Sequence, residues 1–165
     1  MISRVPGVTS VRRGVFPKEI PLILTSQPTF VSSWRASQAT ANTVRDQREK
    51  TGQPMFLHLN HPNFVWGVTA EELMQVHHEK FFEIYNGHPG VNNAGDETRL
   101  GTEAMWDIVL SERLGHLGKE VMYGVATDDS HRYNTDDPRS STSGHGWVVV
   151  RADRLEAGAL VEAMN

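Results

Sequence analysis

From Pro54 to the C-terminus, short apolar runs alternate with segments of helical periodicity, and this alternation limits the chain to one class of fold. The apolar runs predict strands at residues 55–59, 81–85, 121–126 and 147–150. The segments between and after them predict helices at residues 69–78, from Thr102 to Leu114, and from Asp153 onward. Strands that alternate with helices form a mostly parallel sheet, because parallel neighbours need a crossover connection. The sequence therefore predicts an α/β fold with crossover helices, either layered or closed into a barrel.

Capping signals mark the start of two of these helices. Thr69 with Glu72, and Asp153 with Glu156, have the spacing of a capping box, in which side chain and backbone satisfy each other's N–H groups. The helix from Thr102 has apolar side chains at helical spacing, and these are Trp106, Val109, Leu110 and Leu114.

Residues 1–50 carry weaker patterns and form a poorly assigned N-terminal segment. Residues 20–24 predict a short strand, which Pro21 would place at a sheet edge. Residues 36–51 predict a polar helix that ends at Gly52. The length of 165 residues suits a single domain, so residues 51–165 are expected to hold its functional part.

Composition excludes several classes of protein. The chain is 38% hydrophobic and 22% charged, which is typical of an ordered protein, and its net charge of −4 includes no basic stripe for nucleic acid. It has no cysteine, so a metal would be held by His, Asp, Glu or Asn, ligands that suit zinc, manganese or iron. No apolar run is long enough to span a bilayer, and no signal peptide is evident. We therefore expect a cytoplasmic protein without membrane partners.

Polar sequence follows three of the predicted strands, at the point where each strand ends. These polar stretches are residues 60–63, 86–101 and 127–145. Parallel α/β folds bind ligands beyond the carboxyl ends of their strands. Connections as long as the second and third are usually functional or disordered. The sequence therefore predicts a binding site at this edge of the sheet.

Four residues at these strand ends are candidates for a metal site. Asp129 and His131 lie two apart just beyond a strand, so in extended backbone they point the same way. His61 follows a different strand and offers a third ligand. Glu83 lies inside an apolar strand, where a carboxylate is costly to bury unless it is paired or bound to metal.

Each candidate also has a structural interpretation. An isolated Asp-x-His can be a hydrogen-bonded loop, His61 before Pro62 can end a strand, and Glu83 can pair with an Arg or Lys. His58, in mid-strand, is interpreted as a buried histidine with satisfied hydrogen bonds. The combination favours a site, because separate coincidences would be needed to place four such residues at one rim.

Three segments resemble the polymerase and histidinol phosphatase (PHP) family. They are Leu-His-Leu-Asn-His-Pro-Asn at 57–63, Phe-Glu-Ile-Tyr-Asn-Gly-His-Pro at 82–89 and Tyr-Gly-Val-Ala-Thr-Asp-Asp-Ser-His at 123–131. Their order and spacing are similar to the second half of a PHP domain, from about residue 50 onward. The resemblance implies part of a distorted (β/α)7 barrel with two or three divalent metal ions at its C-terminal rim.

The resemblance also implies roles for individual residues. His61 matches the histidine ligand of the His-Pro motif, and Asp129 with His131 matches the final Asp-x-His ligand pair. Other matched or neighbouring residues are expected to support the ligands or contact phosphate, and these are Glu83, Asn86, His88 and Arg132. His88 is also the candidate general acid.

The expected activity is metal-dependent hydrolysis of a small phosphorylated substrate. The opening His-x-His or His-x-Asp pair of the family is absent, since no histidine precedes His58. One alternative is therefore a truncated, non-catalytic remnant that lacks the N-terminal ligands, and another is an amidohydrolase-like enzyme. Part of a barrel exposes sheet edges, so we also expect the chain to form a homo-oligomer, to pair with a missing segment or to be poorly stable.

Overall fold

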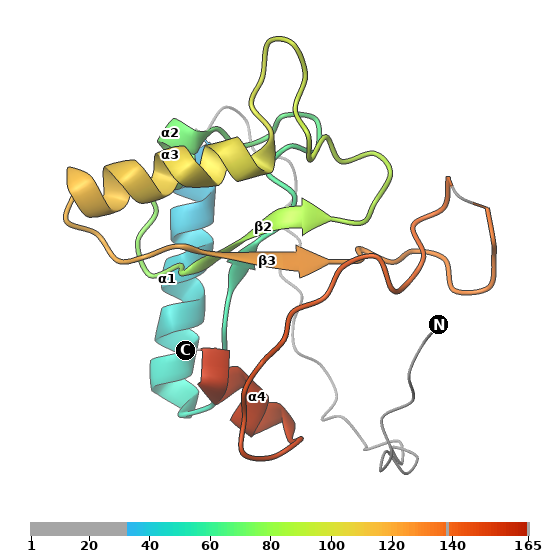
Figure 1. Cartoon of the computed structure of the whole chain (residues 1–165). Helices are drawn as coiled ribbons and strands as arrows, with labels where there is room; N and C mark the ends of the chain where they lie inside the picture. Colours follow the sequence, from blue (N-terminus) through green and yellow to red (C-terminus); the bar gives the residue numbers. More distant parts are fainter. Residues whose placement is uncertain (1–32, 138, 165) are drawn as a thin grey trace. The chain divides into compact units, whose positions relative to one another are not determined.

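The computed structural model describes residues 33–137 and 139–164, which contain a small parallel sheet flanked by helices (Figure 1). The strands are β1 (His58–Leu59), β2 (Phe81–Asn86) and β3 (Tyr123–Thr127), in the order β1-β2-β3. The helices are α1 (Ser33–Thr51), α2 (Ala70–Leu73), α3 (Thr102–Gly115) and α4 (Ala157–Met164). The strand predicted at residues 20–24 lies outside the described residues.

Both strand pairings in this sheet are parallel, with α2 and α3 as the crossover helices. The predicted α/β class with parallel strands is therefore confirmed. Within the described residues the sheet is open, so the (β/α)7 barrel stays a prediction. None of the described helices is long and apolar enough to cross a membrane.

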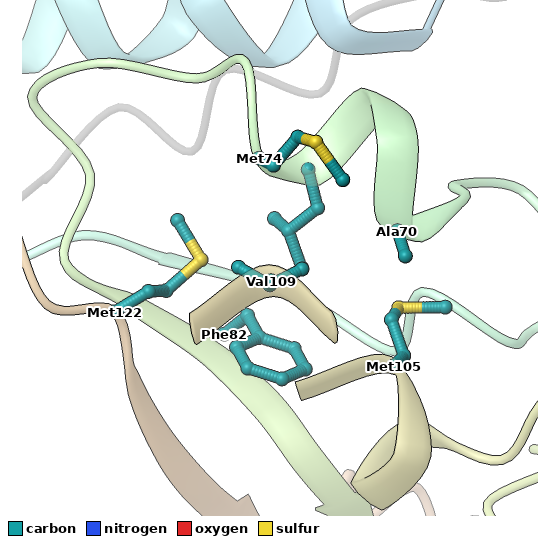
Figure 2. Close-up of a cluster of buried hydrophobic side chains, with 7 residues drawn as sticks. Ala70, Met74, Phe82, Met105, Val109 and Met122 are labelled. Carbon is teal, nitrogen blue, oxygen red and sulfur yellow. The ribbon is translucent and has the colours of Figure 1, made fainter. Parts of the chain in front are cut away.

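One apolar cluster joins the sheet to α2 and α3 (Figure 2). Phe82 of β2 is fully buried at its centre, against Val109 of α3 and Leu73 of α2. The remaining members are Ala70, Met74, Met105 and Met122. Burying a side chain the size of Leu or Phe contributes about 1.5–3 kcal/mol. This packing fixes both helices on β2, and with them the positions at which the strands end.

Helix α3 begins at Thr102, as its sequence predicts. The Thr102 hydroxyl donates to the backbone oxygens of Ile84 in β2 and of Asn93, which ties the first turn to the sheet. The Trp106 indole N–H donates to Met122 O at 2.7 Å. Leu114 is exposed rather than packed, because Arg113, and not Leu114, follows Met105 and Val109 on the buried face of the helix.

Helix α2 starts as predicted but ends early. Thr69 and Glu72 form the complete capping box. The α-helix then stops at Leu73, and the prediction that it continues to residue 78 is wrong. The next carbonyls accept side-chain donors instead: Arg113 Nη1 lies 2.7 Å from Val76 O, and Lys119 Nζ lies 2.8 Å from Met74 O. The two cations thus occupy carbonyl oxygens that would accept backbone N–H groups if the helix continued.

Two predictions near the C-terminus are wrong. Residues 147–150 have the composition of a strand but form no ladder, and Trp147 and Val149 are largely exposed. An apolar run becomes a strand only when a neighbour completes its hydrogen bonds. The last helix starts at Ala157, where Leu160 N–H donates to Glu156 O, so Asp153 does not cap it.

A buried carboxyl, Glu79, lies just before β2. Its side chain is 3% exposed, and its Oε1 atom has no hydrogen-bond partner. Burial raises the pKa of Glu79 to about 8, although the charge of Arg113 acts to lower it. The folded protein therefore holds a proton on Glu79 that the unfolded chain releases near pH 4.5.

We expect the free energy of unfolding to fall as pH rises from about 4.5 to about 8. Over this range the folded state binds more protons than the unfolded state, so raising the pH favours unfolding. Urea denaturation at a series of pH values measures the slope. Glu79→Gln should remove most of it, whereas Glu71→Gln, at an exposed position, should leave it unchanged. The same slope in Glu79→Gln as in the wild type would contradict this assignment.

Candidate functional site

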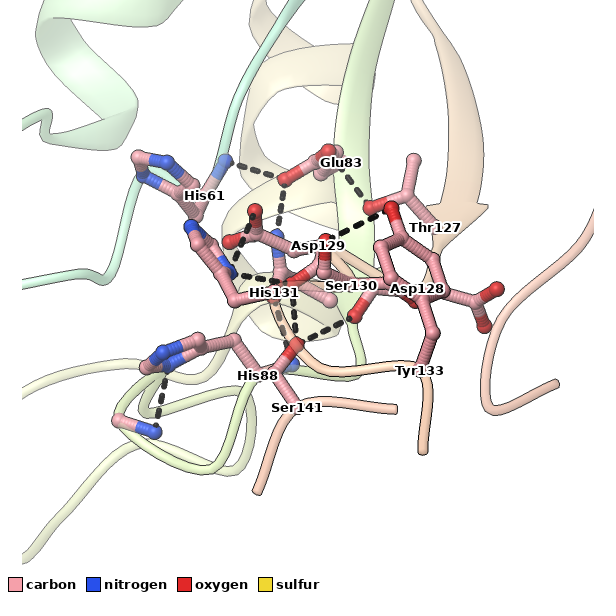
Figure 3. A network of polar contacts seen from close by, with 12 residues as sticks. His61, Glu83, His88, Thr127, Asp128, Asp129, Ser130, His131, Tyr133 and Ser141 are labelled. Atoms are coloured by element: carbon pink, nitrogen blue, oxygen red, sulfur yellow. Dashed lines mark hydrogen bonds and ion pairs between the residues drawn. The ribbon is translucent and has the colours of Figure 1, made fainter. Parts of the chain in front are cut away.

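The polar residues that follow the three strands meet at one edge of the sheet (Figure 3). His61 follows β1, Asn86 and His88 lie at the end of β2, and Asp129 and His131 follow β3. A continuous series of polar and ring contacts joins them, and Glu83 lies at its centre. The structure thus brings together residues that the sequence predicts for one site.

The Glu83 carboxylate links all three strands and is 3% exposed. Its Oε2 atom accepts the His61 backbone N–H at 2.6 Å and the Asn86 side-chain N–H at 2.7 Å. Its Oε1 atom accepts the Thr127 hydroxyl at 2.7 Å. Three donors from three chain segments satisfy this buried charge, which would otherwise be costly. Glu83 therefore holds the strand ends together.

A β-bulge in β2 gives Asn86 its orientation. Glu83 pairs with Val125 and Tyr85 pairs with the next residue, Ala126, so Ile84 is an extra residue on the β2 side. Residues three apart in a regular strand point to opposite faces. The extra residue changes this alternation, and Asn86 can reach Glu83. The Asn86 side chain also donates to Asp129 Oδ2 at 3.3 Å. Asn86 therefore connects Glu83 to Asp129, the first residue of the predicted Asp129–His131 ligand pair.

The geometry of Asp129 and His131 determines which imidazole nitrogen is free. His131 Nδ1 lies 2.8 Å from the Asp129 carbonyl oxygen. A carbonyl only accepts, so Nδ1 carries the proton, and in the neutral ring Nε2 carries the lone pair. Metal-binding histidines commonly use one ring nitrogen while the other donates to a carbonyl or carboxylate. His131 therefore has the tautomer that a ligand through Nε2 requires.

His88 has the opposite tautomer. Its Nδ1 accepts the Gly90 backbone N–H at 3.0 Å, so the proton of the neutral ring is on Nε2. Its backbone N–H donates to Asn86 Oδ1 at 2.8 Å, and its ring packs edge-on against His131 with the centroids 5.4 Å apart. His88 thus has a ring N–H donor at Nε2, on a ring that lies next to that of His131.

Two residues at this rim have left-handed backbone. The φ angle is 25° at His61 and 49° at Asp129. Asn, Asp and His tolerate this region better than most residues, and such backbone is concentrated at functional sites. The His61 ring lies against Phe64, with the centroids 5.3 Å apart, and its backbone is held by Glu83. Both predicted ligands are therefore held by contacts around the backbone.

The donor types at the rim fit a divalent metal, since imidazole nitrogen and carboxylate oxygen are its usual protein ligands. His131 Nδ1 lies 3.8 Å from Asp129 Oδ1. Among the described residues, however, no three or more His, Asp or Glu side chains are grouped closely enough to hold one ion. The contact network is formed, but a three-ligand coordination sphere is not.

Several contributing residues were not identified from the sequence. Thr127 and Asp128 lie between recognised residues without a signal of their own, and Ser141 lies far along an exposed loop. The sequence predicts that His58 is a buried histidine with satisfied hydrogen bonds, but its Nδ1 has no hydrogen-bond partner and lies 3.9 Å from Glu83 Oε1. Burial lowers the pKa of His58, against the opposing charge of Glu83. The side chain of Arg132, predicted to contact phosphate, is exposed.

No family model, no curated protein and no solved structure matches this chain. The functional conclusion therefore depends on the strand-end residues and their contacts. Most of these residues lie in three segments of the chain, at residues 57–63, 82–89 and 123–131.

We predict that Glu83→Gln destabilises the protein by roughly 1–3 kcal/mol, the cost of leaving a buried donor without its acceptor. A glutamine side chain has only one acceptor oxygen. Its N–H2 group would therefore face one of the donors that the wild-type carboxylate accepts. Urea denaturation measures the loss, and Glu71→Gln is the matched control at an exposed site. Equal stabilities of the two variants would contradict the role of Glu83 as a link between strands.

Proposed function

We propose that this chain is a PHP-type, metal-dependent phosphoesterase that acts on a small phosphorylated substrate. The observation that supports this most is the contact network at the strand ends, which gathers His61, Asp129 and His131 on one rim. The tautomer of His131 adds to it, because a free Nε2 is what a metal ligand needs. The resemblance of the surrounding segments to the PHP family is the second line of support.

In this proposal His61, Asp129 and His131 hold zinc, manganese or iron. When bound, such a metal lowers the pKa of a coordinated water and stabilises charge on the phosphate oxygens. Glu83 and Asn86 do not need to touch the metal, since their contacts hold the His61 backbone and the Asp129 carboxylate in place. Waters, the substrate or further protein groups complete the coordination.

His88 and Arg132 act on the substrate in the proposed reaction. The neutral His88 ring donates a hydrogen bond from Nε2–H to a phosphate oxygen. As the general acid it takes up a proton at Nδ1, in place of the bond from Gly90 N–H, and then transfers the Nε2 proton to the oxygen of the leaving group, which leaves the ring neutral. Its position beside His131 suits this role, because the ring is adjacent to the proposed ligand pair. The exposed guanidinium of Arg132 can form paired hydrogen bonds with phosphate oxygens.

We expect Asp129→Asn to reduce manganese- or zinc-stimulated hydrolysis of an aryl phosphate by about 10-fold or more, because a carboxylate ligand is lost. Asparagine tolerates the left-handed backbone at this position, so the variant should fold. Asp136→Asn, at an exposed position in the same loop, is the matched control and should retain the wild-type rate. Equal metal-stimulated rates in wild type and Asp129→Asn would refute the proposed role.

A second candidate is a non-catalytic domain that binds metal weakly or not at all. The observation that favours it is that the described residues contain no group of three ligands around one point. Two or three ligands alone do not satisfy a site of two metal ions.

Metal content separates these two candidates. We expect protein purified without chelator to contain bound zinc, manganese or iron when measured by elemental analysis, at a stoichiometry of one to about two per chain. His131→Gln should lower this content, and His116→Gln, whose exposed ring pairs with Glu112, should not. A content near zero in the wild type would favour the non-catalytic domain.

A further inference from the structure

The loop that follows β3 folds back onto the strand end through Asp128. Its Oδ1 atom accepts the backbone N–H groups of His145 at 2.6 Å and Gly146 at 2.7 Å. Hydrogen bonds from the backbone of Gly146 and Gly144, with a smaller contribution from His145, hold the pKa of Asp128 below its ordinary value. One carboxylate thus closes a loop of residues 128–146 at its base.

Ser141 forms a second set of contacts between this loop and the turn at its start. Its side chain is 4% exposed, in a loop that is otherwise mostly exposed. Its hydroxyl donates to the backbone oxygens of Asp128 and Asp129. Its carbonyl accepts the backbone N–H groups of His131 at 3.1 Å and Arg132 at 2.9 Å. A single residue therefore contacts both ends of the turn from 128 to 132; Figure 3 shows Ser141 beside Asp128 and Asp129.

The Asp129 carbonyl connects Ser141 to the proposed ligand His131. It accepts both the Ser141 hydroxyl and the Nδ1–H of His131. The same carbonyl belongs to a residue with a φ angle of 49°, a conformation that needs support from its surroundings. Ser141 therefore acts on the group that sets the tautomer of His131.

Close packing leaves little freedom for the base of this loop. A Cβ atom on Gly87 would lie 2.7 Å from His145 Cβ, and one on Gly146 would overlap the backbone of Thr127. Both glycines allow the returning chain to lie directly against the ends of β2 and β3. The loop is thus fitted to the strand ends that carry the candidate site.

We propose that Ser141 and Asp128 are positioning residues that hold Asp129 and His131 in their ligand conformation. Their relevance to catalysis rests on the proposed function, but their effect on His131 does not require metal. Ser141 fixes the carbonyl that accepts His131 Nδ1–H, and Asp128 keeps the Ser141 segment closed over the turn. Removing either releases the His131 ring from the Nδ1–H tautomer.

The test compares Ser141→Ala with Ser143→Ala, an exposed serine in the same loop. Nitrogen-15 NMR of the histidine rings in metal-free protein, at about pH 8.5 where an ordinary imidazole is neutral, reports the tautomer of His131. We expect Nδ1–H in the wild type and in Ser143→Ala, and a mixture of tautomers in Ser141→Ala. The affinity for added zinc or manganese should fall about 10-fold in Ser141→Ala and remain unchanged in Ser143→Ala.

A wild-type tautomer in folded Ser141→Ala overturns the positioning role. If circular dichroism shows Ser141→Ala to be unfolded, Asp128→Ala, which removes the acceptor of the His145 and Gly146 N–H groups, takes its place. Asp136→Ala is then the control, and an unchanged tautomer in folded Asp128→Ala also overturns the positioning role. Wild-type protein that binds no metal refutes the proposed function instead, and the NMR comparison still decides the positioning role.

Discussion

The buried carboxylate of Glu83 is the interaction on which the candidate site depends. It lies in the middle strand of the sheet and accepts donors from the loop after β1, from β2 itself and from the end of β3. A buried carboxylate is tolerated only when its hydrogen-bonding capacity is met. Satisfying Glu83 therefore brings three strand ends to one place, and the polar residues that follow them become neighbours.

The apolar cluster and the bulge determine where this carboxylate points. Phe82 packs into the cluster with α2 and α3, so its neighbour Glu83 is directed away from these helices. The extra residue in β2 then returns Asn86 to the side of Glu83. Apolar packing on one face of the sheet thus determines that the Glu83 carboxylate and the Asn86 amide lie on the opposite face.

The two histidines beside Glu83 and Asn86 have complementary roles because local backbone groups select opposite tautomers. A carbonyl accepts from Nδ1 of His131, and an N–H donates to Nδ1 of His88. One ring offers a lone pair and the other a proton, in edge-on contact. This pairing suits a site that binds a cation and an anionic substrate together, as the proposed phosphoesterase requires. The loop closed by Asp128 and Ser141 supports the first of these rings.

The parallel α/β class, the start of α3, the capping box of α2 and the polar strand ends could all be predicted from the sequence, because they depend on residues close together in the chain. Its strand at residues 147–150 and the long form of α2 were wrong, since ladder partners and the cations of Arg113 and Lys119 lie far away in sequence. Four features could not be predicted in this way: the hydrogen bonds that gather around Glu83, the bulge at Ile84, the contacts of Ser141 with the 128–132 turn, and the tautomers of the two histidines. Each of these is set by a hydrogen bond or register whose partner becomes known only once the chain has folded.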